Sequence, residues 1–193
     1  MSAILSAAIL ITLLISVLIL IAIAVFAVSI YNSLVTLNVN IDRASSNIEV
    51  LLKQRFDEIP RLVEICKGYM AHERETLEKV IKARDIFMNA PETASKIRAN
   101  YRLGAALQPL FAVSERYPKL KANEEFIHLQ KRVTALENEI ADRREFYNAS
   151  VAVFNSRIRQ IPDIAIAGFL KYKEKSMFKS SDSAEYEKIN FTL

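Results

Sequence analysis

The chain opens on a long apolar run that carries no charge. No Asp, Glu, Lys, Arg or His occurs between Met1 and Ile41, and only hydroxyl side chains interrupt residues 3–30, at Ser6, Thr12, Ser16 and Ser29. A helix of about 20 apolar residues crosses the hydrocarbon core of a bilayer. The pattern therefore predicts a transmembrane anchor over residues 1–30, whose hydroxyl groups bond back to the helix.

A cleaved signal peptide is the alternative interpretation of this run, because Ala22-Ile23-Ala24 resembles a small-residue cleavage site. Signal peptides carry positive charge ahead of an apolar stretch of about 7 to 15 residues. Here no Lys or Arg precedes the run, and the run is far longer. We therefore expect a retained anchor.

Beyond residue 30 the apolar positions take the spacing of a packed helix. They follow one another at intervals of three and four residues, at Leu34, Leu37, Ile41, Ala44, Ile48 and Leu51. Such a seam is the face by which a helix packs on its neighbours. No Gly or Pro occurs before Pro60. We therefore expect one helix from Ala3 to Phe56, about 80 Å long at ~1.5 Å per residue.

Proline residues divide the next part of the chain into two further helices. The second helix begins near Pro60 and ends at Asn89, with an apolar face of Leu62, Ile65, Cys66, Tyr69, Leu77, Val80 and Phe87. The third extends from Glu92 to Arg116, with an inward face of Leu103, Leu107, Leu110 and Val113. Pro109 falls inside the third helix and should bend it.

The fourth helix has the most regular pattern. Asn123 is a suitable N-cap, and Pro162 ends the helix. Its seam contains Phe126, Leu129, Val133, Leu136, Ile140, Tyr147, Phe154 and Ile161, with Arg143, Ser150 and Arg157 at the remaining seam positions. Short connections between helices of similar length favour antiparallel neighbours. The sequence thus predicts an all-α fold, in which the transmembrane helix continues into an antiparallel up-down-up-down four-helix bundle over residues 31–162.

Residues 163–193 form a tail in which apolar and aromatic residues give way to lysines. In the predicted topology the fourth helix returns toward the membrane, so the tail should begin close to the bilayer. Aromatic rings and ammonium groups suit the headgroup region. The residues expected there are Phe169, Lys171, Tyr172, Lys173, Lys175, Phe178 and Lys179. A tail folded over the end of the bundle is an equally good interpretation.

The charged residues are spread through helices of mixed sign. The formal net charge is +4, without a block of like charges or aromatic residues interleaved with arginines. The pattern therefore does not indicate a nucleic-acid partner. The single cysteine, Cys66, excludes an intramolecular disulfide framework, and its apolar neighbours favour a buried thiol.

Candidate catalytic and metal-binding motifs are incomplete. A di-iron bundle needs two Glu-x-x-His pairs, and only Glu125 and His128 fit that spacing. His72-Glu73 begins like a zinc protease motif, but Thr76 stands where the second histidine is required. We therefore expect no cofactor and no enzyme activity. A metal-binding or enzymatic bundle that uses Glu125 and His128 is the alternative.

Polar residues also occur within the predicted bundle helices. Arg143 and Arg157 occupy seam positions, and further candidates for the interior are Asn47, Arg55, Glu64, Arg84, Asn138, Arg144 and Asn148. Such side chains extend to solvent or pair with glutamates of a facing helix. Alternatively, Arg143 and Arg157 form an interaction surface or set the register between helices.

Two features bear on assembly and orientation. Ala8, Thr12 and Ser16 recur every four residues as a stripe of small side chains, which predicts homo-oligomerisation through this face of the anchor. Arg43 follows the anchor and no cation precedes it, so the positive-inside tendency favours a cytoplasmic bundle.

Several segments resemble the LemA family of bacterial membrane proteins. They are Tyr31–Val35, Ser46–Pro60, Leu62–Glu64, Lys67–Tyr69, His72–Glu73, Glu115–Asn123, Leu136–Ala141 and Arg144–Asn148. In the family a Trp often precedes the Ser-Asn-Ile run, and Ser45 occupies that place here. The resemblance implies one spanning helix and a helical bundle at the bacterial inner membrane. It adds no established biochemical activity, although one branch of the family is associated with building an organelle membrane in magnetic bacteria.

The leading hypothesis for function is a non-enzymatic scaffold or interaction protein at the lipid bilayer. It would act through homo-oligomerisation or through an unidentified membrane or cytoplasmic protein partner. An adaptor for a membrane protease or a stress system differs from this hypothesis only in its partner, which the sequence does not name.

Overall fold

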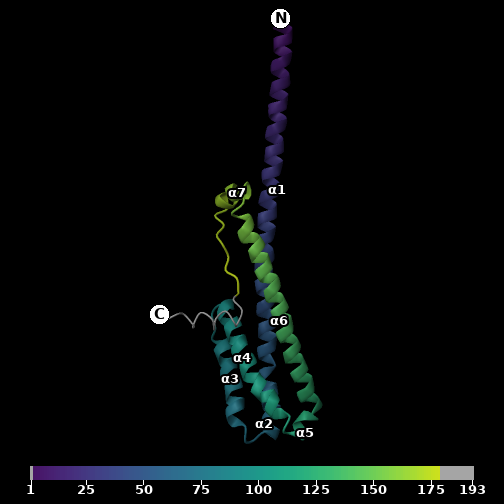
Figure 1. Ribbon diagram of the computed structural model, residues 1–193, viewed down its shortest axis with the longest axis vertical. Coiled ribbons are helices and arrows are strands. Elements are labelled where there is room, and N and C mark those ends of the chain that lie inside the picture. Colours follow the sequence, from purple (N-terminus) through teal and green to yellow (C-terminus); the bar gives the residue numbers. More distant parts are fainter. Residues whose placement is uncertain (1, 179–193) are drawn as a thin grey trace, which may run out of the picture. The chain divides into compact units, whose positions relative to one another are not determined.

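The computed structural model describes the backbone of residues 2–178, and their side chains except at residues 2–5, 7 and 8. In this part of the chain every regular element is a helix (Figure 1). The chain divides into two compact units. Unit 1 comprises Met1–Ile41 and Ser150–Ser176, and unit 2 comprises Asp42–Ala149 and Met177–Leu193.

Seven helices occur within the described residues. Two of them are long and contribute residues to both units, α1 (Ser2–Asp57) and α6 (Glu124–Arg157). The others are α2 (Ile59–Tyr69), α3 (Arg74–Met88), α4 (Thr93–Ser114), α5 (Pro118–Lys121) and α7 (Asp163–Phe169). The expected all-α fold with a long apolar N-terminal helix is therefore confirmed.

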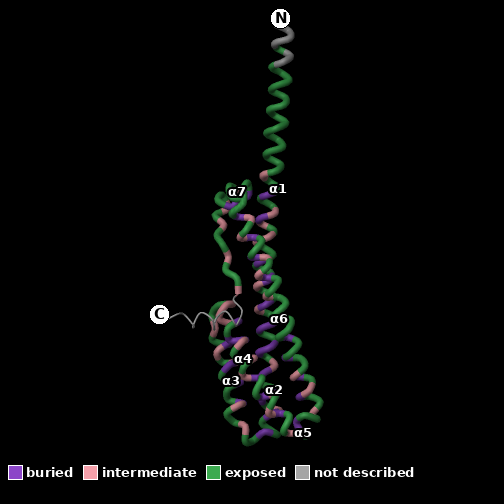
Figure 2. The backbone as a smooth tube through the Cα atoms, viewed as in Figure 1, coloured by how far each residue is buried: buried purple, intermediate pink, exposed green. Residues whose placement is uncertain are grey.

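The helix α1 changes character along its length. Every side chain from Ile9 to Phe26 is exposed, and the first buried one is Ile30 (Figure 2). Beyond it the predicted seam is confirmed, because Leu37 is half-buried and the other seam residues are buried: Leu34, Ile41, Ala44, Ile48 and Leu51. Among the described residues, one helix is long and apolar enough to cross a membrane, and its most apolar 18 residues have a mean hydropathy of 3.3.

The second predicted helix is wrong as a single element, because it is divided into α2 and α3. Met70 leaves the helical conformation, with φ −118° and ψ 51°, and its amide donates to the Cys66 carbonyl at 2.8 Å. The Met70 side chain is fully buried, which secures the turn without a Gly or a Pro. Tyr69, expected on the inner face, is exposed.

The core of unit 2 is built from apolar faces of several helices. Helix α3 packs against α2 and α4. The ring of Phe56 in α1 stacks on Phe87 in α3, with centroids 3.8 Å apart. In α4 the predicted inward residues Leu103, Leu107 and Leu110 are buried, whereas Val113 is half-buried.

Helix α6 begins as predicted and then changes phase. The Asn123 side chain accepts a hydrogen bond from the Phe126 amide at 2.9 Å, as an N-cap does. The predicted seam residues are buried up to Ile140 and again at Tyr147 and Phe154. The other inward positions after Ile140 are the half-buried Arg144 and the buried Val151 and Ile158. Two successive steps of four residues, 136 to 140 to 144, shift the seam because 3.6 residues per turn do not fit a strict seven-residue repeat.

This change of phase corrects two seam predictions, because Arg143 is exposed and Ser150 is only half-buried. The predicted end of the helix at Pro162 is also wrong, since α6 ends at Arg157 and Ile161, 89% exposed, lies outside it. The tail prediction also needs a correction, because residues 163–169 form the helix α7.

Candidate functional site

Two hydroxyl groups in the exposed part of α1 bond back to the helix. The Thr12 hydroxyl donates to the Ile9 carbonyl at 2.9 Å, and the Ser16 hydroxyl donates to the Leu13 carbonyl at 2.8 Å. The expected back-bonding is thus confirmed at these two positions. Such bonds remove the cost of placing a hydroxyl in hydrocarbon. The side chain of Ala8, the third member of the predicted stripe, lies outside the described residues.

In unit 1 an arginine at the end of α6 connects three segments. The Arg157 Nε donates to the Asp163 carboxylate of α7 at 2.6 Å, and Nη1 donates to the Ser33 hydroxyl of α1. Asp163 is only 8% exposed, so its charge is compensated by this arginine. Arg157 therefore fixes the position of α7 against α1, which is a structural role for one of the two predicted interaction residues.

Arg143, the other predicted interaction residue, lies on the surface. Its guanidinium is 3.8 Å from the Glu139 carboxylate one turn earlier in α6. The neighbouring Arg144 points inward instead and lies over the Tyr101 ring, 4.8 Å from the centroid. The structure therefore does not bring Arg143 and Arg157 to one surface of a single unit.

The helix α7 has an apolar outer face. Asp163 and Ala167 are buried, whereas the exposed positions of the helix carry Ile164, Ala165, Gly168 and Phe169, and the exposed Ile161 lies just before it. A surface helix usually shows the reverse pattern, with polar residues outward. The exposed fractions of Ile161 and Phe169 reach 89% and 83%.

The residues of the predicted membrane-interface tail separate into two groups. Phe169, Lys171 and Lys173 are exposed. In contrast, the Tyr172 ring packs edge-on against Phe154 in α6, with centroids 5.4 Å apart. The Lys175 ammonium lies 6.0 Å from the centroid of the same Phe154 ring.

Asparagine side chains of α6 hold the backbone of the tail. In unit 1, Asn155 donates to the Lys175 carbonyl at 2.8 Å and accepts from its amide at 2.9 Å. In unit 2, Asn148 makes the same pair of bonds with Phe178, at 2.9 and 2.8 Å. The Phe178 ring stacks on Tyr147, whose pKa is raised by burial and by the nearby charge of Asp42. Lys179 lies outside the described residues.

Unit 2 contains a buried arginine that continues the seam of α1. Arg55 follows Leu51 by four residues and is 0% exposed. Its Nη1 donates to the side-chain amide oxygen of Asn100 in α4, and its Nη2 lies 2.8 Å from the Glu137 carboxylate of α6. Burial lowers the pKa of the Arg55 guanidinium, while the nearby charge of Glu137 opposes that shift.

A glycine makes room for this ion pair. A Cβ atom at Gly104 would lie 3.0 Å from the Glu137 carboxylate. Gly104 follows Asn100 by four residues, so both lie on the face of α4 that meets Arg55 and Glu137. The residues that form this network are Arg55, Asn100, Gly104 and Glu137; we call them the Arg55 network.

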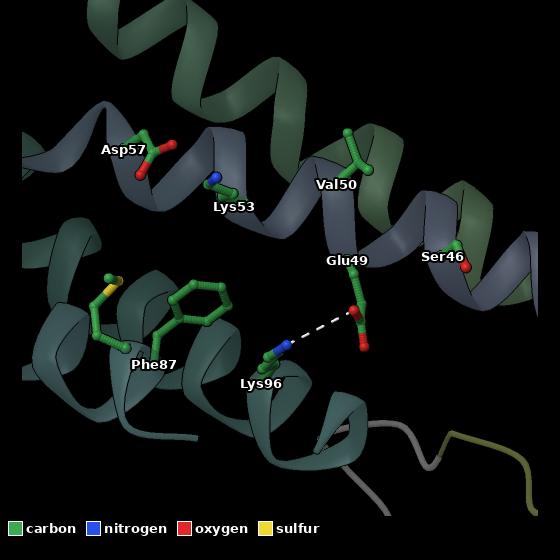
Figure 3. A pocket seen from close by; sticks show the side chains of 8 residues that line it. Ser46, Glu49, Val50, Lys53, Asp57, Phe87 and Lys96 are labelled. Atoms are coloured by element: carbon green, nitrogen blue, oxygen red, sulfur yellow. Dashed lines mark ion pairs between the residues drawn. The ribbon is translucent and has the colours of Figure 1, made fainter. Parts of the chain in front are cut away.

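A groove of about 420 Å³ lies on unit 2 (Figure 3). One wall belongs to α1, and Phe87, Met88 and Lys96 of α3 and α4 form the other. The Glu49 carboxylate of α1 faces Lys96 across the groove at 3.7 Å and accepts a hydrogen bond from Thr93. Charges of both signs line it, so it lacks the single-sign field that attracts nucleic acid or free anions.

The alternative hypothesis of a metal site has no support among the described residues. In that part of the chain, no group of three or more His, Cys, Asp or Glu side chains lies close enough to hold a metal ion. Glu125 is engaged by Arg61 of α2, and His128 is exposed on α6. Cys66 is buried as expected, and burial raises the pKa of its thiol to about 12.

Comparison with known proteins identifies the family of this chain. The profile of the LemA family matches residues 44–191. The chain belongs to the LemA family. The match begins beyond the apolar run of α1 and covers the helical region that follows it. The resemblance predicted from the sequence segments is thereby confirmed.

Similar proteins include magnetosome proteins of two species and a LemA protein of a third. The magnetosome protein MamQ 2 of Paramagnetospirillum magneticum is 24% identical over 181 residues, which cover 80% of this chain and 66% of the relative. MamQ of Magnetospirillum gryphiswaldense has the same identity and coverage. The protein LemA of Metamycoplasma hominis is 26% identical over 143 residues, covering 74% of this chain and 65% of the relative. The chain thus spans about two thirds of the length of these relatives.

Proposed function

We propose that this LemA-family chain is a non-enzymatic scaffold, anchored by α1 in the bacterial inner membrane. One observation carries the proposal: α1 is a single helix whose exposed apolar part, Ile9–Phe26, continues without a break into the buried seam from Ile30 onward. Any force on the helical region is therefore transmitted to the anchor through a continuous hydrogen-bonded helix.

We further propose that the helices alternate in direction as an antiparallel four-helix bundle, with α2 and α3 together as the second member. Contacts between α3 and α4 support this arrangement. So do the hydrogen bond that Thr93 of α4 donates to Glu49 of α1 and the ion pair between Lys96 and Glu49. The bundle faces the cytoplasm in this proposal, because Arg43 follows the anchor and the positive-inside tendency acts over such short distances.

The scaffold acts through copies of itself or through a protein partner at the bilayer. Thr12 and Ser16 are exposed on one face of α1, and small side chains there allow a second helix to approach closely. Counting photobleaching steps of the full-length fluorescent chain in bilayers measures the copy number. We expect more than one copy per particle, and fewer copies after the substitutions Ala8→Leu, Thr12→Leu and Ser16→Leu.

The matched control enlarges two exposed side chains on the opposite face of α1, with Leu10→Phe and Leu14→Phe. This variant should keep the copy number of the native chain. Single copies of the native chain in bilayers, together with no crosslinked protein neighbour in cells, would contradict the proposed scaffold.

A further inference from the structure

The outer face of α7 is apolar although it is exposed at the surface, where helices usually carry polar residues. Ile161, Ile164 and Phe169 are exposed to 89%, 50% and 83%, and the positions between them on this face are Ala165 and Gly168. Ile164, Ala165, Gly168 and Phe169 are spaced by one, three and four residues, which places them on one side of α7. Ile161 lies two residues before the helix begins. The polar residue of this segment, Asp163, is turned inward instead.

The inward position of Asp163 fixes the direction of the apolar face. Arg157 holds the carboxylate at 2.6 Å and also donates to Ser33 of α1. Ser33 lies five residues beyond Val28, the last exposed apolar residue before the first buried side chain, Ile30. At ~1.5 Å per residue, the apolar face of α7 is therefore tied to α1 within about 8 Å of Val28 along the helix.

Two cations follow the apolar face directly. Lys171 and Lys173 are exposed just after α7. The φ of 54° at Lys171 turns the chain back, so that Tyr172 packs on Phe154 while the lysines remain outside. Apolar side chains beside exposed lysines match the chemistry of the boundary between anionic headgroups and acyl chains.

We propose that the outer face of α7, with Lys171 and Lys173, is a second lipid contact in the headgroup region of the membrane that α1 crosses. The proposal rests on the membrane anchor of the proposed function. A lipid surface is favoured over a protein partner because the apolar face is joined, within unit 1, to the exposed apolar segment of α1. Lipid already surrounds that segment once α1 is inserted.

An environment-sensitive fluorophore at residue 165 tests this contact in the full-length chain. Ala165→Cys is labelled in a Cys66→Ala background, and the protein is placed in nanodiscs with one chain per disc. We expect blue-shifted emission from the label at residue 165. Its quenching by lipids that carry a nitroxide on the headgroup should be at least about threefold stronger than that of a control label at Ala141→Cys. Residue 141 lies about 24 Å before the end of α6 along the helix. Anionic lipid should strengthen the quenching, and Lys171→Gln with Lys173→Gln should remove that dependence.

Matched variants separate the apolar face from general surface effects. We expect at least about threefold weaker quenching after Ile161→Ser, Ile164→Ser and Phe169→Ser, and no change after Phe146→Ser and Val153→Ser, which alter exposed residues of α6. Water-like emission at residue 165 in a chain that is inserted in the disc would overturn the proposal. Shielding that appears only with two chains per disc would also overturn it, in favour of a second copy. If the chain does not insert into nanodiscs, the membrane anchor of the proposed function is contradicted, which is a result distinct from the failure of the α7 contact.

Discussion

The guanidinium of Arg55 lies 2.8 Å from the carboxylate of Glu137, and the cation is fully buried whereas the Glu137 side chain is 49% exposed. An arginine in a helix seam needs a compensating charge, because an unpaired buried cation is strongly destabilising. Since Glu137 remains in contact with water, this ion pair contributes less to the free energy of unfolding than a fully buried pair would.

Removing the charge of Glu137 should destabilise unit 2. We expect Glu137→Gln to lower the free energy of unfolding by about 1–2 kcal/mol, since Arg55 then keeps only neutral amide oxygens as partners and no compensating charge. Urea unfolding of the detergent-solubilised chain, followed by circular dichroism, measures this. The control Glu139→Gln should change the value by less than about 0.5 kcal/mol, because its contact with Arg143 is exposed and 3.8 Å long. Equal effects of the two variants would show that the buried pair does not stabilise the fold.

The effect of Gly104→Ala should depend on Glu137. Alanine favours a helix over glycine by about 1 kcal/mol, but its Cβ would lie 3.0 Å from the Glu137 carboxylate. In a Glu137→Ala background we expect the full gain in stability. With Glu137 present we expect the gain to shrink by about 1 kcal/mol or more, because the carboxylate must move away from Arg55. Additive effects in this double-mutant cycle would argue that Gly104 has no role in the Arg55 network.

Much of this architecture follows from spacing along the sequence. The seam of α1 and the first five seam positions of α6 were predictable because long, regular helices bury apolar residues at fixed intervals. Arg55 itself follows the same spacing, four residues beyond Leu51. Its burial could be suspected from this spacing. Its partners could not, since Asn100 and Glu137 come from helices whose register is set by tertiary packing.

The errors have equally specific causes. The turn that starts at Met70 was missed because residues 70–73 contain no Gly or Pro, and Gly68, two residues earlier, lies inside α2. The phase of α6 changes after Ile140, which moved Arg143 out of the interior and brought Arg144 toward it. A helix as short as α7 was hidden because its buried face contains an aspartate.

The Cys66 thiol should make stability depend on alkaline pH. Burial raises its pKa from 9.0 to about 12, so above pH 9 the unfolded chain loses this proton while the folded chain retains it. The contribution of Cys66 is therefore present below pH 9 and is lost as the pH rises toward 12. Relative to Cys66→Ala, the native chain should lose about 1 kcal/mol of unfolding free energy between pH 9 and pH 10. Parallel pH profiles for the two proteins in urea unfolding would exclude this assignment.

Neutralising Asp163 should loosen α7 without unfolding the chain. In Asp163→Asn the charge-assisted bond to Arg157 is lost, so amides of α7 should exchange with deuterium about tenfold faster. The control Glu174→Gln alters an exposed pair with Arg159 and should change the exchange of α7 less than about threefold. Unchanged exchange in Asp163→Asn would mean that other contacts hold α7 in place.

The continuity of α1 from lipid to helical core is tested most directly by spin labels placed singly along residues 9–56 of the membrane-inserted, Cys66→Ala chain. Accessibility to oxygen and to a water-soluble nickel chelate is measured at each position. The account predicts high oxygen and low chelate access from Ile9 to Val28, followed without interruption by a helical period with minima at Leu34, Ile41 and Ile48. Chelate access along the apolar part, or loss of the helical period between residues 28 and 34, would contradict it.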